Sequence, residues 1–198
     1  INPTPVLTLA GTNLLCSGDN SGAINLTVTA GTAPFSFAWT GPDGYTAGTE
    51  DISGLKAGYY AVTVTDSKGC KASGNTTLTQ PAPLSLSKSG DIALLCFGAT
   101  NGAGSFTAAG GTTPYSFTTL VNTTGATLTP GASSVAVTNA GAGTITVQVT
   151  DAHMCTAQST ITVTQPAALS VTAVLSKSIE GSHNINCFGG NTGAISTT

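Results

Sequence analysis

One motif occurs twice in this chain and begins a third time. Each complete copy has a cysteine, a Gly-Ala pair, and a Pro-aromatic-Ser-Phe run whose proline follows the cysteine by 18 residues. Both copies also have Val-Thr-Asp, a cysteine four residues after that Asp, and a closing Gln-Pro-Ala. The matched residues are Cys16, Pro34, Asp66, Cys70 and Gln80 in the first copy, and Cys96, Pro114, Asp151, Cys155 and Gln165 in the second. Self-similarity at a fixed period indicates a tandem array of small domains.

The repeat length sets the expected domain organisation. Gln80 and Gln165 are 85 residues apart, so we expect a first repeat at 1–82, a second at 83–167 and a partial third at 168–198. The partial copy is too short to fold alone, and we expect it to be ordered only through contact with the preceding domain or a neighbouring chain. Because the chain starts without Met or a signal peptide and stops within a repeat, we expect it to be a stretch of a longer protein.

Apolar and polar residues alternate in several short runs, and no run keeps a helical period. In the run that ends at Thr65, for example, Tyr60, Val62 and Val64 share one face. Clusters of Gly, Pro, Asn and Asp separate the runs, as is typical of turns between strands. The first-repeat strands are expected at 7–9, 24–28, 35–39, 60–65 and around Leu78.

This pattern predicts an all-β protein made of tandem immunoglobulin-like β-sandwiches of about seven strands each. Short Gln-Pro-Ala joints leave little slack between domains. We therefore expect the domains to form a semi-rigid rod.

The matched cysteines predict structural disulfides, because the chain has the character of a secreted protein. Alternating strand directions lead us to expect the first and last strand connections at one end of each sandwich. This placement predicts the bonds Cys16–Cys70 and Cys96–Cys155, each contributing roughly 4 kcal/mol on the chain-entropy model. Two alternatives stay open: free buried thiols, or bonds between neighbouring repeats, Cys70–Cys96 and Cys155–Cys187.

The composition excludes several classes of partner. Charged residues are only 7% of the chain, which suits an extracellular polymer better than a cytosolic protein, whose residues are about a quarter charged. The formal net charge of −3 gives no basic surface for nucleic acid and no polybasic cluster for anionic lipid. No apolar run approaches the roughly 18 residues that a membrane span needs. We therefore expect neither a nucleic-acid partner nor membrane insertion.

The sequence offers little catalytic chemistry. His153 and His183 lie in different repeats, and no nucleophile elbow, metalloprotease helix or Cys-x2-Cys pair occurs. Asp66 and Asp151 recur at a strand end, where an aspartate accepts hydrogen bonds from its own turn. One carboxylate per site is a poor calcium site. We expect no enzyme activity, no metal and no cofactor.

The phrase Cys-x-Gly-x3-Gly-Ala-Ile from Cys16, the Pro-Phe-Ser-Phe-x-Trp run from Pro34 and the Val-Thr-Asp strand at 55–66 with Gly69-Cys70 resemble the SprB repeat. The resemblance covers nearly the whole chain, strongly in the first copy, partly in the second and at the opening of the third. The second copy departs from it at Thr119, which replaces a Trp, and at Met154, which replaces a Gly.

The resemblance implies a very long bacterial surface adhesin of the kind used in gliding motility, exported by the type IX system and displayed as filaments. The expected function is thus that of structural repeat modules giving mechanical reach at the bacterial cell surface. The expected partners are neighbouring repeats of the same chain and other copies in a filament.

An alternative is a repeated carbohydrate- or surface-binding module that gains affinity through avidity. Sugar-binding platforms need exposed aromatic rings, and most rings here are expected on inward faces. Tyr45 and Tyr59 are the candidate ligand contacts, with a surface polysaccharide as the partner.

Overall fold

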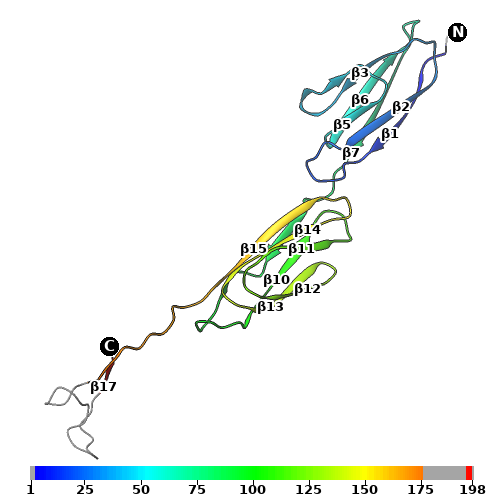
Figure 1. Cartoon of the computed structure of the whole chain (residues 1–198). Helices are drawn as coiled ribbons and strands as arrows, with labels where there is room; N and C mark the ends of the chain where they lie inside the picture. Colours follow the sequence, from blue (N-terminus) through cyan, green and yellow to red (C-terminus); the bar gives the residue numbers. More distant parts are fainter. Residues whose placement is uncertain (1–2, 176–194, 198) are drawn as a thin grey trace, which may run out of the picture.

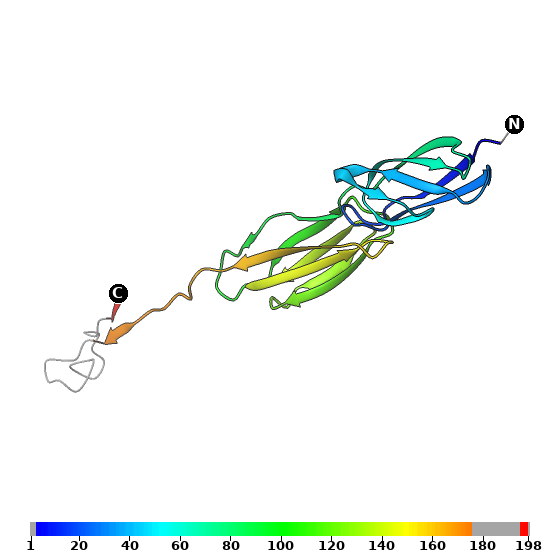
Figure 2. The same cartoon turned by 90° about the horizontal axis from the view of Figure 1, so that it is seen from above.

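The computed structural model describes residues 3–175 and 195–197 and contains two β-sandwiches that lie end to end (Figure 1). The view from above shows the same end-to-end arrangement (Figure 2). One sheet of the first sandwich has the order β1 (Val6–Thr12), β2 (Gly22–Ala30), β5 (Ile52–Leu55). The facing sheet has the order β4 (Thr46–Ala47), β3 (Ser36–Thr40), β6 (Gly58–Thr65), β7 (Lys71–Leu78). All strand pairs of this sandwich are antiparallel.

The second sandwich repeats this plan with four strands in each sheet. One sheet has the order β12 (Thr127–Pro130), β13 (Ser134–Ala140), β10 (Gly102–Ala109), β8 (Ser85–Lys88). The other has the order β11 (Ser116–Asn122), β14 (Gly143–Thr150), β15 (Thr156–Thr164), β9 (Ile92–Ala93), and β9 runs parallel to β15. The expected all-β fold of tandem Ig-like sandwiches is confirmed.

The chain then continues to β16 (Ala173–Leu175), which pairs antiparallel with β17 (Ile195–Thr197). Residues 176–194 and 198 of the expected partial third copy, with His183 and Cys187, lie outside the described residues.

The alternation of apolar and polar residues along the strands puts the expected side chains in the core. On β6, Tyr60, Val62 and Val64 are buried, and the strands expected at 24–28 and 60–65 lie within β2 and β6. The Tyr60 hydroxyl donates to the Lys56 carbonyl oxygen at 3.0 Å, so that its polar tip stays satisfied inside the core.

The two cores obtain their largest aromatic ring from different strands. Trp39 on β3 is buried, and its indole N–H donates to the Thr49 carbonyl oxygen at 2.9 Å. The matched Thr119 on β11 is exposed, whereas Phe106 on β10 is fully buried in the second core. The second core therefore keeps an aromatic ring despite the lost Trp.

Candidate functional site

Each sandwich has a leading end, where the chain arrives, and a trailing end, where it leaves. In the first sandwich the β6–β7 turn lies at the leading end, because the Ser67 N–H donates to the Thr32 carbonyl in the β2–β3 loop at 2.9 Å. The β1–β2 loop lies at the trailing end, because the Leu14 N–H donates to the Thr79 carbonyl at 3.0 Å.

The bonds predicted within each repeat, Cys16–Cys70 and Cys96–Cys155, are wrong. Seven strands have six connections, and alternating strand direction puts odd and even connections at opposite ends. The β1–β2 loop is the first connection and the β6–β7 turn is the sixth. In the first sandwich, the two cysteines therefore lie at opposite ends and cannot bond. In the second, the Leu94 N–H donates to the Thr164 carbonyl near Cys96, whereas the Ala152 N–H donates to the Thr112 carbonyl near Cys155, so these cysteines lie at opposite ends as well.

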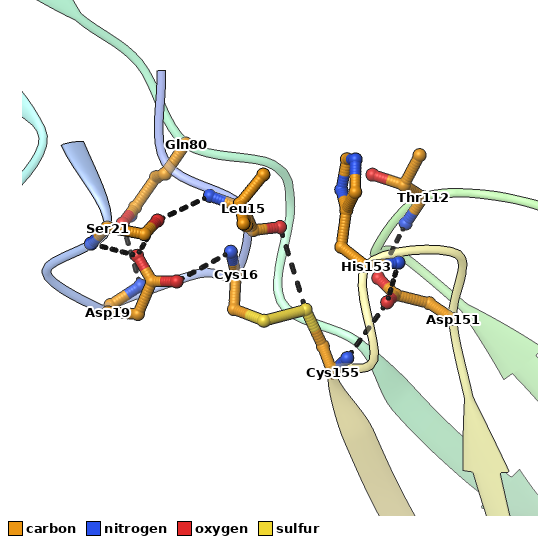
Figure 3. The surroundings of a disulfide bond; sticks show 10 residues. Leu15, Cys16, Asp19, Ser21, Gln80, Thr112, Asp151, His153 and Cys155 are labelled. Atoms are coloured by element: carbon orange, nitrogen blue, oxygen red, sulfur yellow. Dashed lines mark hydrogen bonds between the residues drawn. A yellow bond between two sulfur atoms is a disulfide. The ribbon is translucent and has the colours of Figure 1, made fainter. Parts of the chain in front are cut away.

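The structure instead has one disulfide between the repeats, Cys16–Cys155, with a Cα–Cα distance of 5.8 Å (Figure 3). It joins the trailing end of the first sandwich to the leading end of the second, across 139 residues of sequence. In the described part of the chain, Cys70 and Cys96 are free thiols. The alternative of bonds between neighbouring repeats is right in kind, but both of its pairs are wrong. Cys155 bonds to Cys16 and not to Cys187, and Cys70 and Cys96 do not bond to each other.

Local hydrogen bonds fix the loop that carries Cys16. The Asp19 carboxylate accepts from the Cys16 N–H at 3.0 Å, and from the Ser21 N–H and hydroxyl at 3.1 and 2.9 Å. The Ser21 hydroxyl oxygen in turn accepts from the Leu15 N–H at 2.8 Å (Figure 3). The Leu15 carbonyl oxygen lies 3.6 Å from the Cys155 sulfur, so the loop contacts the second repeat directly.

Asp151 fixes the turn that carries Cys155. Its buried carboxylate accepts N–H hydrogen bonds from Thr112, His153 and Cys155, each 2.9 Å long. Asp66 does the same in the first repeat, where the Cys70, Lys68 and Thr32 N–H groups donate at 2.8, 2.9 and 3.2 Å. The expected role of both aspartates, as acceptors in their own turns, is confirmed.

These contacts also set the ionisation of the two aspartates. Burial alone raises the pKa of Asp151, but the donors from Thr112, Cys155 and His153 outweigh it, so the pKa lies below the ordinary value. For Asp66, burial likewise raises the pKa, and the three backbone donors and the nearby Lys68 charge bring it below the ordinary value.

We expect acid to destabilise both sandwiches through these carboxylates. Because the folded-state pKa lies below the unfolded value of about 3.9, the stabilisation is complete above about pH 4 and is lost as pH falls through the folded pKa. Denaturant unfolding midpoints between pH 7 and pH 2 measure this. Asp66→Asn should flatten the acid decline of the first sandwich, and Asp151→Asn that of the second. Identical acid profiles for wild type and both variants would contradict this assignment.

The linker between the sandwiches is bound to both of them. The Gln80 side-chain oxygen accepts from the Gly18 N–H at 2.8 Å in the cysteine loop of the first sandwich. Two residues later, the Ala82 carbonyl accepts from the Gly111 N–H of the second sandwich at 2.8 Å. We did not predict this role for Gln80 from the sequence, although its recurrence as Gln165 was the available signal. The junction is held by the disulfide and by hydrogen bonds on both sides of the linker.

The two tyrosine candidates do not form one site. Tyr45 is half-buried, packs edge-on against Tyr60 with ring centroids 5.6 Å apart, and lines a hollow of about 240 Å³. The 3-10 turn η1 (Pro42–Gly44) forms one wall, and Lys56 bonds to Asp43 at 2.9 Å on the rim. Tyr59 is 57% exposed on β6 and is not among the residues that line the hollow.

Over residues 3–175 and 195–197, no three His, Cys, Asp or Glu side chains gather as metal ligands. The same residues include no helix with the length and apolar character of a membrane span.

Several solved structures are similar to this chain. The three N-terminal domains of the bacteriophage RB49 highly immunogenic outer capsid protein align over 88% of this chain and 61% of their own, with 15% identity and a TM-score of 0.43. A C-terminal fragment of intimin, solved with the intimin-binding domain of its receptor, aligns over 80% and 64%, with 16% identity and a TM-score of 0.45. The two Ig domains of DIP-gamma align over 84% and 99%, with 10% identity and a TM-score of 0.46.

The chain spans less than two thirds of the first two of these structures. No curated protein sequence is significantly similar to it. Residues 8–44, which run from β1 to η1 and include Cys16, match the SprB repeat family. Together with tandem Ig-like sandwiches, this match suggests a non-catalytic structural module of a cell-surface protein. Residues 8–44, in the first of the two sandwiches, are thus similar to the SprB repeat.

Proposed function

We propose that these repeats are structural segments of a long extracellular bacterial adhesin or filament of the gliding or attachment type. Their task is mechanical reach, and the type IX system is the export route that the SprB repeat suggests. The observation that carries the proposal is the junction, where the Cys16–Cys155 bond joins two sandwiches end to end. A flexible linker would let the repeats fold back on one another, whereas a cross-linked joint keeps them extended.

From the position of the disulfide we predict how the chain responds to a pulling force. When the two ends are pulled, the load passes through the disulfide and bypasses the stretch from Cys16 to Cys155, which contains β2 to β14. Single-molecule pulling should show no release of these strands in the oxidised chain. Reduction should release 139 residues, which is roughly 450–500 Å of extended chain.

The matched control for the pulling experiment is Cys96→Ser, which should behave as the wild type does. Full-length unfolding of the oxidised wild-type chain would show that the junction does not carry the applied force.

A second candidate function, repeated binding of a surface polysaccharide, is favoured by the hollow beside Tyr45. An aromatic ring next to an acidic and a basic side chain, Asp43 and Lys56, matches the stacking and hydrogen-bonding needs of a sugar ring. If this function holds, Tyr45→Ala should reduce glycan-array binding by at least about tenfold, as loss of one aromatic contact often does. Tyr59→Ala, outside the hollow, is the matched comparison. Equal glycan binding by wild type and Tyr45→Ala would exclude the hollow as the binding site.

A further inference from the structure

The trailing end of the second sandwich presents Cys96 as the first sandwich presents Cys16. The Gly98 N–H donates to Gln165 Oε1 at 2.8 Å, as the Gly18 N–H does to Gln80. The Leu94 N–H donates to the Thr164 carbonyl at 2.8 Å and the Ala99 N–H to the Cys96 carbonyl at 3.3 Å. The corresponding bonds in the first sandwich are Leu14 to Thr79 at 3.0 Å and Asp19 to Cys16 at 3.4 Å. The two cysteine loops therefore have the same backbone arrangement.

The leading end of the first sandwich likewise presents Cys70 as the second presents Cys155. In each turn the aspartate N–H donates to the cysteine carbonyl at 3.0 Å. The residue before each cysteine, Gly69 or Met154, adopts a positive φ, of 80° and 67°. Met154 keeps the turn without the glycine that this conformation favours. The free thiol of Cys70 thus sits in the geometry that already forms a bond at Cys155.

The surface around Cys96 is apolar and uncovered. Leu95 is 93% exposed and Phe97 is 58% exposed, next to a cysteine that is itself exposed. Leu15, which matches Leu95, is only 45% exposed at the junction, where its carbonyl meets Cys155. Neighbouring exposed apolar side chains mark a surface that gains from being covered.

We propose that this junction is one step of a disulfide ladder, in which each trailing-end cysteine bonds to the leading-end cysteine of the repeat that follows. Cys96 then bonds to the turn cysteine of a following repeat, and Cys70 to the loop cysteine of a preceding one. The partner is a repeat with the same Asp-to-Cys turn, recognised by its thiol and by the apolar contact with Leu95 and Phe97. This ladder goes beyond the proposed function, because it depends on the junction and not on where the protein is displayed.

The chemistry needs an oxidant, for which a small-molecule disulfide such as oxidised glutathione suffices. One cysteine thiolate attacks the oxidant and releases one glutathione, giving a mixed disulfide. The second cysteine thiolate then attacks that cysteine sulfur and releases the second glutathione. Two thiols lose two electrons and two protons, and one glutathione disulfide becomes two glutathione thiols.

The test inserts a copy of residues 3–82 between Ala167 and Ala168. This insertion restores the 16-residue spacing from Gln-Pro-Ala to the next loop cysteine that Gln80 and Cys96 have. The original Cys70 and Cys187 are replaced by serine, so that the copied Cys70 is unique. The chain is oxidised with glutathione disulfide and free thiols are blocked with N-ethylmaleimide. Disulfides are then mapped without reduction after chymotrypsin digestion, which separates Cys96 from Cys155.

The ladder predicts a peptide that links Cys96 to the copied Cys70, beside the Cys16–Cys155 link. Labelling of Cys96 by N-ethylmaleimide should fall about tenfold or more relative to the chain without the insertion, because a bonded cysteine has no thiolate to react. Replacing Cys96 by serine should return the copied Cys70 to full labelling. A bond between the copied Cys70 and the copied Cys16, or full labelling of Cys96, overturns the proposal.

A second insertion, of residues 83–167 at the same site, places a copy of Cys155 in the repeat that follows the original Cys96. The inserted turn is the one whose Cys155 forms the disulfide in the present structure. This insertion therefore tests the ladder even if the first insertion folds poorly. Protection of Cys96 in this chain supports the ladder, and full labelling of Cys96 overturns it.

Discussion

Replacing Cys16 by serine should lower the free energy of unfolding of the two-repeat unit by about 5 kcal/mol. The Cys16–Cys155 bond closes a loop of 139 residues. On the chain-entropy model a loop somewhat longer than 100 residues contributes about 5 kcal/mol, because the unfolded chain loses conformational freedom. The loss is comparable to the whole stability of a small domain. Differential scanning calorimetry of wild type and variant measures it directly.

The chain supplies its own controls for this experiment. Cys70→Ser and Cys96→Ser remove thiols that are free in the described residues and should leave the unfolding transitions unchanged. Cys155→Ser should match Cys16→Ser, and the double variant should lose nothing more, since both remove the same bond. Wild-type stability in the Cys16→Ser variant would show that the repeats do not depend on their cross-link.

Replacing Trp39 by alanine should destabilise the first sandwich by about 3–5 kcal/mol, the usual cost of emptying a large aromatic site in a core. Trp39 is buried, and its loss also leaves the Thr49 carbonyl without the indole N–H. Because each sandwich has its own core, the unfolding transition of the second should keep its midpoint. Chemical denaturation followed by hydrogen exchange separates the two transitions.

Two further substitutions, at Thr119 and Phe106, test whether Phe106 on β10 replaces the missing Trp in the second core. Thr119→Ala, at the exposed site that corresponds to Trp39, should change stability by less than about 0.5 kcal/mol. Phe106→Ala should destabilise the second sandwich as Trp39→Ala destabilises the first. A large loss at Thr119 would mean that the second core is arranged differently.

The strands and the turn aspartates could be predicted from the sequence because their signals are local. Alternation along Tyr60 to Thr65 depends only on neighbours in the chain, and Asp66 and Asp151 bond within their own turns or to the adjacent loop. The burial of Phe106 in place of the missing Trp could not be predicted in the same way. It depends on two strands, β10 and β11, that lie in different sheets.

The cysteine pairing failed for a topological reason. About seven strands were expected, and in seven alternating strands the first and sixth connections lie at opposite ends of the sandwich. The prediction placed both cysteine loops at one end, against that alternation. The bond to the next repeat could not be predicted from a single sandwich, because it depends on how two sandwiches meet.

The disulfide has a consequence for how these repeats respond to proteolysis. A protease that cuts one peptide bond anywhere between Cys16 and Cys155, in the linker for example, yields two fragments that remain joined through sulfur. Such a nick sheds no fragment until the disulfide is reduced. Gels run with and without reductant after limited digestion would show it as one band that becomes two.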